Sequence, residues 1–158
     1  ASEKYTKRLR SSLKRYGVEN SIHLYSGNPH NVIQHSHIGI GSSGTVSLEH
    51  ACLETPYIAN YRFGKLSYQI AKYLMAEKFK KIKYISLPNI IAKEKIMPEF
   101  LQYDCHPLAL SNELLKSITD KDYYASQKKT LSQFREKLGG KSASKDAAMV
   151  ILDMLNKE

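Results

Sequence analysis

The sequence has little cysteine and no long apolar run. Only two cysteines occur among the 158 residues, Cys52 and Cys105, and they form no C-x-x-C pair. We therefore expect two small buried thiols in a reducing compartment, not a disulfide framework. No run of about 18 apolar residues is present, so no transmembrane helix is expected. Residues 1–5 carry charges and no apolar core, and we expect no secretory signal peptide.

Recognisable metal and nucleophile motifs are also missing. His35 and His37 lie two residues apart, but no cysteine or carboxylate at a suitable spacing completes a metal site. Ser42, Ser43 and Ser47 lack the G-x-S-x-G context of a nucleophilic serine. The sequence therefore predicts no metal, no cofactor and no serine-triad catalysis.

Acidic residues are in the minority. Lysine and arginine together number 24 against 15 aspartates and glutamates, which gives a net charge of +9. This excess favours an acidic partner: a nucleotide, a phospholipid surface or nucleic acid. No aromatic–basic RNA motif accompanies the charge. One lysine cluster occurs, in which the side chains either face solvent at a helix end or contact anionic lipid headgroups. It consists of Lys78, Lys80, Lys81 and Lys83.

What the sequence does contain is an alternation of strand and helix signals. The strand candidates are 21–25, 38–40, 57–61 and 84–87, and the helix candidates are 3–16, 29–34, 45–54, 66–79, 108–118, 122–138 and 145–155. Gly17 is expected to end the first helix, and Asn28 and Pro29 to begin the second. Such alternation predicts an α/β fold, a Rossmann-like parallel sheet with helices on both faces, followed by a helical tail. Because a Rossmann-like half normally begins with a strand and this chain opens on a helix, we expect it to be part of a larger protein.

The stretch from Gly39 to Glu49 carries the clearest site signal. Gly39, Gly41 and Gly44 lie between a strand and a helix, where ligands bind in open α/β sheets. Small residues let main-chain N–H groups approach an anion, and a helix start favours negative charge, so a diphosphate fits. A dinucleotide fits less well, because the next strand reaches Asn60 without an acidic residue for the ribose. A tight turn without a ligand is the alternative.

Three polar side chains are predicted to join this stretch. Glu49, in the second turn of the helix, is placed to accept hydrogen bonds from ribose hydroxyls. Arg62 follows the strand 57–61 and suits a phosphate. Asn89 follows the strand 84–87, where its amide suits sugar hydroxyls or phosphate. Each alone is equally compatible with an ordinary surface or turn residue, and their expected convergence at one sheet edge is what favours a site.

These residues resemble the carboxy-terminal domain of the lipid-A-disaccharide synthase family, glycosyltransferase family 19. The blocks that carry the resemblance are Ser43-Gly44-Thr45-Val46-Ser47-Leu48-Glu49, Pro56, Tyr61-Arg62, residues 84–92, residues 98–102, residues 134–139 and the alanine-rich last helix. Together they cover nearly the whole chain. Ser-Leu-Pro-Asn at 86–89, in order with the other blocks, is specific to that family.

The resemblance implies a hexosyltransferase of lipid A biosynthesis with a GT-B fold. Such an enzyme transfers the sugar of UDP-2,3-diacylglucosamine to 2,3-diacylglucosamine 1-phosphate and releases UDP. It implies a cytoplasmic protein, peripheral on the anionic inner-membrane surface of a Gram-negative bacterium, with a homodimer among the expected assemblies and no nucleic-acid partner. It also implies a donor UDP site made of Ser43, Gly44, Thr45, Glu49, Arg62 and Asn89.

By the same resemblance, the general base and much of the acceptor site belong to an amino-terminal half. We therefore assign no catalytic residue here and expect no turnover by the chain alone. Residues 1–138 are expected to form the UDP-binding domain without its first strand, and 139–158 a helix that packs toward the other half. Lys93-Glu94-Lys95 departs from the family's Gly-Arg/Lys-Glu, which puts a phosphate role there in doubt. A muramyl-type N-acetylglucosaminyltransferase, which would not carry 86–89, and a nucleic-acid-binding module are the alternatives.

Overall fold

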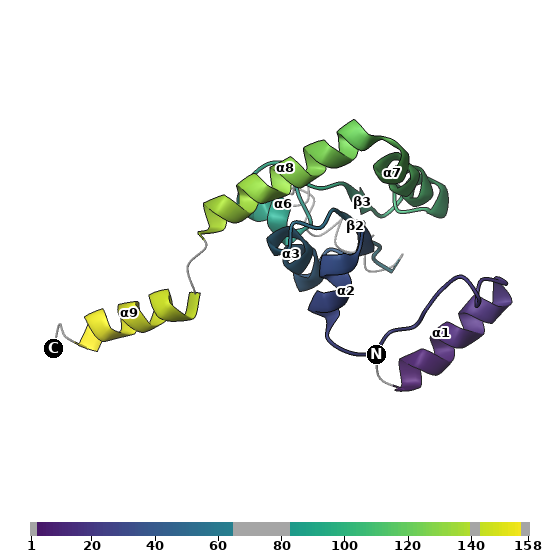
Figure 1. Cartoon of the computed structure of the whole chain (residues 1–158), viewed down its shortest axis with the longest axis horizontal. Coiled ribbons are helices and arrows are strands. Elements are labelled where there is room, and N and C mark those ends of the chain that lie inside the picture. The colour runs from purple at the N-terminus through teal and green to yellow at the C-terminus, as the bar shows by residue number, and fades with distance from the viewer. Residues whose placement is uncertain (1–2, 65–82, 140–142, 156–158) are drawn as a thin grey trace.

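The computed structural model of the chain describes residues 3–64, 83–139 and 143–155 (Figure 1). In chain order the elements are α1 (Glu3–Arg15), α2 (Pro29–His35), β1 (Gly39–Ser42), α3 (Thr45–Cys52), β2 (Tyr57–Tyr61), α6 (Leu87–Ala92), β3 (Glu99–Leu101), α7 (Pro107–Thr119), α8 (Lys121–Leu138) and α9 (Ala143–Leu155). The helix expected over 66–79 lies outside the described residues.

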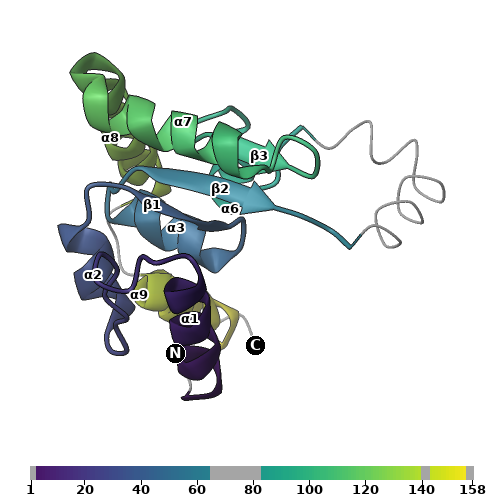
Figure 2. The same cartoon turned by 90° about the vertical axis from the view of Figure 1, so that its right-hand side faces the viewer.

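Among the described residues, three parallel strands form the sheet, in the order β1-β2-β3. Ser42 at the end of β1 pairs with Asn60, and Tyr61 at the end of β2 pairs with Leu101. The carboxyl ends of the strands therefore meet at one edge. Figure 2 shows α7 on one side of the strands and α3 on the other. The expected α/β class, with a parallel sheet flanked by helices and a helical tail, is confirmed.

Strand β2 runs through the centre of the core. Tyr57, Ile58 and Ala59 are each at most 2% exposed. Because strand side chains alternate, Tyr57 and Ala59 face one side and Ile58 the other. The expected burial on both faces is therefore confirmed for residues 57–59, whereas Asn60 is half-buried and Tyr61 is exposed. The side of Tyr57 and Ala59 forms the main apolar cluster with Ala51, Ile96, Met97, Leu131 and Phe134.

Local signals set several helix ends as expected. The Asn28 side chain accepts a hydrogen bond of 3.0 Å from the His30 N–H, and Pro29 occupies the first turn of α2. Gly17 has a φ of 65° just beyond α1, a left-handed conformation that glycine adopts without strain. The helices predicted over 45–54, 108–118, 122–138 and 145–155 are present as α3, α7, α8 and α9 with shifted ends.

The strand expected at 21–25 is wrong. These residues form no strand, and within the described part of the chain β1 pairs with β2 alone. Ile22, Leu24 and Tyr25 are 45%, 37% and 59% exposed. Without a neighbouring strand the main-chain groups have no ladder to join, so apolar alternation alone does not make a strand.

The strand expected at 84–87 is also wrong. Ser86 is instead the N-cap of α6, and Pro88 lies in its first turn, where proline is well tolerated. The Glu99 carboxylate accepts hydrogen bonds from the N–H groups of Ile85 and Ser86 and from the Ser86 hydroxyl. These N–H groups are therefore bonded to a side chain and not to a strand. Strand β3, which contains Glu99, was not predicted.

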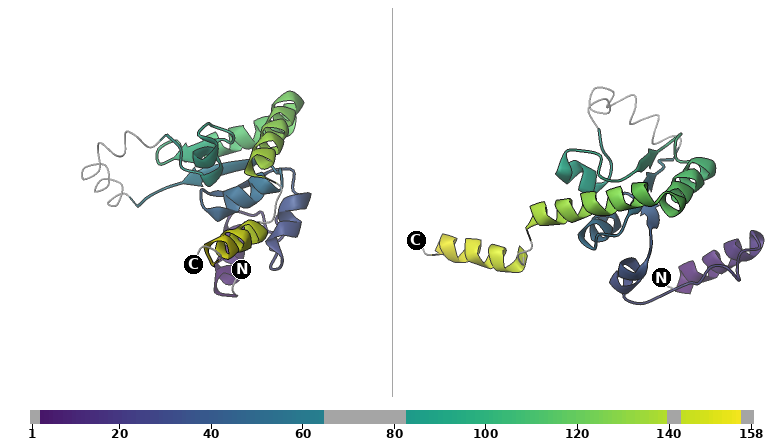
Figure 3. Two further views of the ribbon diagram at one scale, coloured as in Figure 1. Left: turned by 90° about the vertical axis from the view of Figure 1, so that its left-hand side faces the viewer. Right: turned by 45° about the horizontal axis from the view of Figure 1, so that its top comes forward.

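Helices α1 and α9 extend away from the sheet at opposite ends of the molecule (Figures 1 and 3). Helix α8 ends at Leu138. The division into a domain over 1–138 and a separate segment over 139–158 stays a prediction. Among the described residues, no helix is both long and apolar enough to cross a membrane. The side chains of residues 145–155 in α9 are exposed, and the large apolar residues among them are each more than half exposed. They are Met149, Val150, Ile151, Leu152, Met154 and Leu155.

Candidate functional site at the carboxyl edge of the sheet

The turn between β1 and α3 forms the centre of the candidate site. Gly44 is the N-cap of α3 and, having no side chain, places no capping group over the helix start. Gly44, Thr45 and Val46 are exposed, whereas Ser47 is buried and donates its hydroxyl hydrogen to the Gly44 carbonyl at 2.7 Å. The first N–H groups of a helix have no partners within the helix. This start of α3 therefore offers exposed amides and a favourable dipole to an anion.

The other two glycines of the stretch serve packing. A Cβ atom on Gly39 would lie 2.2 Å from His50 Nε2, and one on Gly41 would lie 2.6 Å from the Tyr57 hydroxyl oxygen. That hydroxyl donates to the Ser42 carbonyl at 2.9 Å. Gly39 and Gly41 therefore do not make room for an anion, contrary to the expectation. The side chains of His50 and Tyr57 occupy the space beside them.

His50 lies beneath the candidate turn and is only 6% exposed. Its Nδ1 is 2.8 Å from the Val46 carbonyl oxygen, and its ring centroid is 4.4 Å from that of Tyr57. Burial lowers the pKa of His50, against smaller raising effects of the Val46 carbonyl and the Glu49 carboxylate. The neutral ring is therefore the form that the fold favours.

This lowered pKa predicts an acid-sensitive fold. Below the ordinary value of 6.5 the unfolded chain binds a proton at His50 more readily than the folded one does. The stabilisation is complete above that value and is lost as the pH falls through the folded pKa. Urea unfolding at about pH 7.5 and about pH 5.5 should show a smaller loss of stability for His50→Gln than for the unchanged chain. An equal loss in His50→Gln and in the exposed-site control His23→Gln would contradict this.

Glu49 lies between two hollows, one turn into α3. One hollow, of about 710 Å³, also includes Ser42 and Val46. The other, of about 390 Å³, includes Thr45 and His30. His30 Nε2 is 3.6 Å from a Glu49 carboxylate oxygen, and the Glu49 side chain remains 35% exposed. The carboxylate is thus accessible, close to the exposed start of the helix.

Arg62 directly follows β2 and is exposed. Since Ser42 pairs with Asn60, the residues after Ser42 and the residue Arg62 lie at the same edge of the sheet. Arg62 forms no ion pair with a carboxylate of the described residues. Its guanidinium is therefore available to an anion at that edge.

Asn89 does not project from that edge. It lies in α6 and is fully buried, so the expected position after a strand is wrong. Its Oδ1 accepts hydrogen bonds from the N–H groups of Ile96 at 2.8 Å and Met97 at 3.0 Å, and its Nδ2 donates to the Met97 carbonyl at 3.0 Å. Asn89 thus holds the segment that leads into β3. A direct contact with a ligand stays a prediction.

Comparison with known proteins decides the family. The family model "Lipid-A-disaccharide synthetase" matches residues 1–153. The chain belongs to the lipid-A-disaccharide synthase family. Curated synthases of this name are similar to it: one from Sulfurihydrogenibium sp. is 40% identical over 80% of this chain and 31% of its own length. Those from Trichlorobacter lovleyi and Haemophilus influenzae are 31% and 32% identical over 88% and 85% of this chain.

The chain spans about a third of the length of these lipid-A-disaccharide synthases, 31–35% of each. The resemblance seen in the sequence is confirmed. Membership in this family decides against the muramyl-type transferase. Whether the chain binds nucleic acid is left to the titration described below.

Several residues that shape the site in this lipid-A-disaccharide synthase family member were not found from the sequence. They are His50, Tyr57, Glu99 and Gln102. The glycines of β1 were the signal that could have indicated His50 and Tyr57, because small residues in one strand leave room for large rings from neighbouring elements. The last two act on main-chain groups that are distant in the sequence, for which the sequence has no local signal.

The two cysteines are free, and Cys52 is exposed beside Thr45 and Glu49. Its expected burial is wrong, since the last turn of α3 turns it to the surface, and Cys105 is partly exposed. In the described ranges, no three His, Cys, Asp or Glu side chains come together as metal ligands. Of the lysine cluster, Lys83 is described and exposed, and the other three lysines lie outside the described residues.

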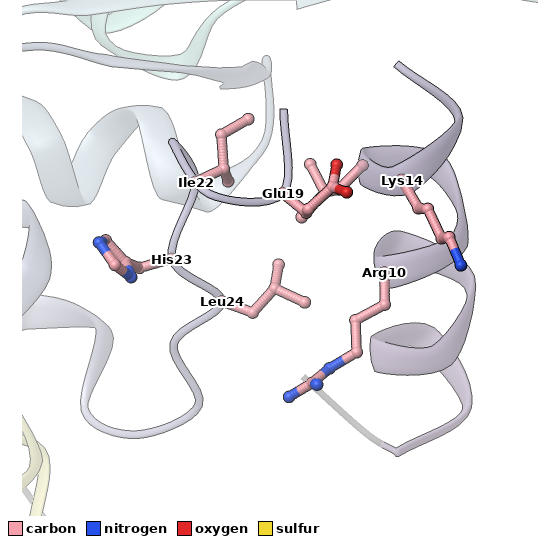
Figure 4. A pocket seen from close by; sticks show the side chains of 7 residues that line it. Arg10, Lys14, Glu19, Ile22, His23 and Leu24 are labelled. Carbon is pink, nitrogen blue, oxygen red and sulfur yellow. The ribbon is translucent and has the colours of Figure 1, made fainter. Parts of the chain in front are cut away.

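A further hollow, of about 480 Å³, lies between α1 and the extended segment that follows it. Figure 4 shows Arg10 and Lys14 projecting from α1, with Ile22 and Leu24 across from them. Glu19 lines the same hollow and partly balances the two cations. None of the predicted donor-site residues lines it, so it is separate from the candidate site of this family member.

Proposed function

We propose that this chain holds the UDP of the donor sugar in a lipid-A-disaccharide synthase. The reaction transfers 2,3-diacylglucosamine from UDP to 2,3-diacylglucosamine 1-phosphate, giving the β-1,6-linked disaccharide 1-phosphate and UDP. The observation that carries the proposal is the exposed start of α3 with Glu49 one turn further, at the same sheet edge as Arg62. Family membership supports the substrate class.

In this proposal the diphosphate lies against the amides of Ser43, Gly44 and Thr45. The helix dipole and the Arg62 guanidinium stabilise the negative charge that develops on the diphosphate as the sugar leaves. Glu49 accepts hydrogen bonds from the ribose hydroxyls and so fixes the nucleoside. Asn89 contributes from inside, by holding the turn between α6 and β3.

The general base and the acceptor site are proposed to lie in the remainder of the longer protein. The chain alone is therefore proposed to bind UDP without turnover. Both substrates carry acyl chains, so we further propose that the full enzyme works as a cytoplasmic, peripheral protein on the anionic inner-membrane surface. The net charge of +9 favours that surface. A homodimer is part of the same proposal.

Calorimetric titration of the chain with UDP tests the proposal, with a single-stranded RNA titrated in parallel at two salt concentrations. We expect saturable UDP binding that changes little with salt, and RNA binding that is weak and falls steeply with salt. A chain that binds RNA but not UDP would contradict the proposal. Disaccharide synthesis by the chain alone would contradict its dependence on the remainder of the enzyme.

A further inference from the structure

Helix α2 lies beside α3, and its first turn carries His30 (Figure 1). The Asn28 side chain accepts a hydrogen bond of 3.0 Å from the His30 N–H, and Pro29 precedes His30 in the same turn. A capped helix start with proline in its first turn restricts the main chain there. The main chain of His30 is therefore held in place, although its side chain is 60% exposed.

The His30 ring faces the carboxylate of Glu49. Its Nε2 is 3.6 Å from one of the carboxylate oxygens. That distance is longer than a hydrogen bond, so the attraction acts between the protonated ring and the carboxylate, and a ring about 0.7 Å closer would donate directly. Within the described ranges, this is the one ion pair that Glu49 makes.

A second imidazole, that of His50, lies near the same carboxylate but has another partner. Its Nδ1 is 2.8 Å from the Val46 carbonyl oxygen, and the ring is buried. Because burial lowers the pKa of His50, its neutral form is favoured, and a neutral ring attracts a carboxylate weakly. His30 is therefore the ring that can draw the Glu49 carboxylate to one position.

The hollow of about 390 Å³ brings His30 together with Thr45 and Glu49. Thr45 is at the start of α3, where the diphosphate is proposed to lie, and Glu49 follows one turn later, about 6 Å along the helix axis. A glutamate side chain loses rotamer freedom when a ligand fixes it, which weakens binding. A carboxylate already drawn toward His30 has less of that freedom left to lose.

We propose that His30 is a positioning residue that holds the Glu49 carboxylate for the ribose hydroxyls of the donor nucleotide. The inference rests on the proposed function, since it needs a ribose at Glu49. A carboxylate has two oxygens with about four acceptor positions, so it can pair with His30 and still accept hydrogen bonds from the ribose. His30 acts through Glu49 and makes no contact with the ligand itself.

Calorimetric titration with UDP and with 2′-deoxy-UDP tests the proposal, because these ligands differ only in the 2′-hydroxyl. The unchanged chain should bind UDP more tightly than 2′-deoxy-UDP. His30→Ala should weaken UDP binding about threefold, in the range for an exposed ion pair, and 2′-deoxy-UDP binding by less, so that the preference for UDP falls. His30→Lys, which keeps a cation, should restore most of the preference. In a Glu49→Ala background, His30→Ala should have no further effect.

His35→Ala is the matched control. His35 lies in the last turn of the same helix, is exposed, and has its Nδ1 2.8 Å from the Asn31 carbonyl oxygen. Its replacement should leave both affinities unchanged. If His30→Ala weakens the binding of both ligands equally, or leaves the preference for UDP as it was, the positioning role is overturned.

The same titrations separate this inference from the proposed function. An unchanged chain that binds UDP and 2′-deoxy-UDP equally well would overturn the inference and leave the diphosphate site in place. An unchanged chain without affinity for UDP would overturn the proposed function itself.

Discussion

Replacing Asn89 by alanine is expected to lower the free energy of unfolding by about 3–5 kcal/mol, the upper range for a single substitution. The variant loses three buried hydrogen bonds, and the N–H groups of Ile96 and Met97 and the Met97 carbonyl lose their partner. Unmade hydrogen bonds in the interior cost more than the bonds themselves contribute, since water does not reach the groups. Urea unfolding monitored by circular dichroism measures the change.

The control for this experiment is Asn112→Ala, at an exposed position of α7. It should change the free energy of unfolding by no more than about 0.5 kcal/mol. Asn89→Asp, which keeps the acceptor for the two N–H groups but not the donor, should give an intermediate loss of stability. A loss for Asn89→Ala as small as that for Asn112→Ala would show that the segment before β3 is held by other contacts.

Replacing Glu49 by alanine is expected to weaken UDP binding by about 1–3 kcal/mol, the range for hydrogen bonds to a charged group. Glu49 lies one turn from the exposed start of α3 and is partly exposed, so its carboxylate is accessible for hydrogen bonds from ribose hydroxyls. Glu49→Gln, which keeps one acceptor and removes the charge, should lose less. Isothermal titration of UDP measures both.

Glu94→Ala provides the matched control, because it removes one exposed carboxylate, which is paired with Lys137 at 3.9 Å. It gives the same change in net charge at a distance from the candidate site. Removing a carboxylate by itself favours an anionic ligand, so if Glu94→Ala and Glu49→Ala weaken UDP binding equally, the loss is not specific to the candidate site. An unchanged dissociation constant for Glu49→Ala would remove Glu49 from the site.

Much of the fold could be predicted because its signals are local. The order Asn28-Pro29, the glycine after α1 and the apolar run of β2 each depend on neighbours within a few residues, and each appears as expected. The placement of Ser43 to Glu49 and of Arg62 at one edge followed from the rule that parallel strands end together. These residues are the part of the candidate site that the sequence predicted.

What the sequence could not reveal depends on partners far along the chain. The segment before Pro88 looks like a strand, but Glu99 binds its N–H groups and α6 forms instead. Residues 21–25 have strand composition and no neighbouring strand among the described residues. The predicted role of Asn89 depended on a strand over 84–87, which the structure does not contain. The hydrogen bonds of Gln102 depend on a left-handed main-chain conformation that composition does not encode.

The occupied start of α6 has a consequence for where an anion can settle. The amides of Ile85 and Ser86, directly before the first residue of α6, already bond an internal negative group, the Glu99 carboxylate, so a phosphate at that position would meet a like charge. At the start of α3 no side chain of the N-cap residue bonds the main-chain amides, because that residue is Gly44. Of these two helix starts, the one at α3 is therefore the better place for the phosphates of the proposed donor, with the ribose one turn further along the helix.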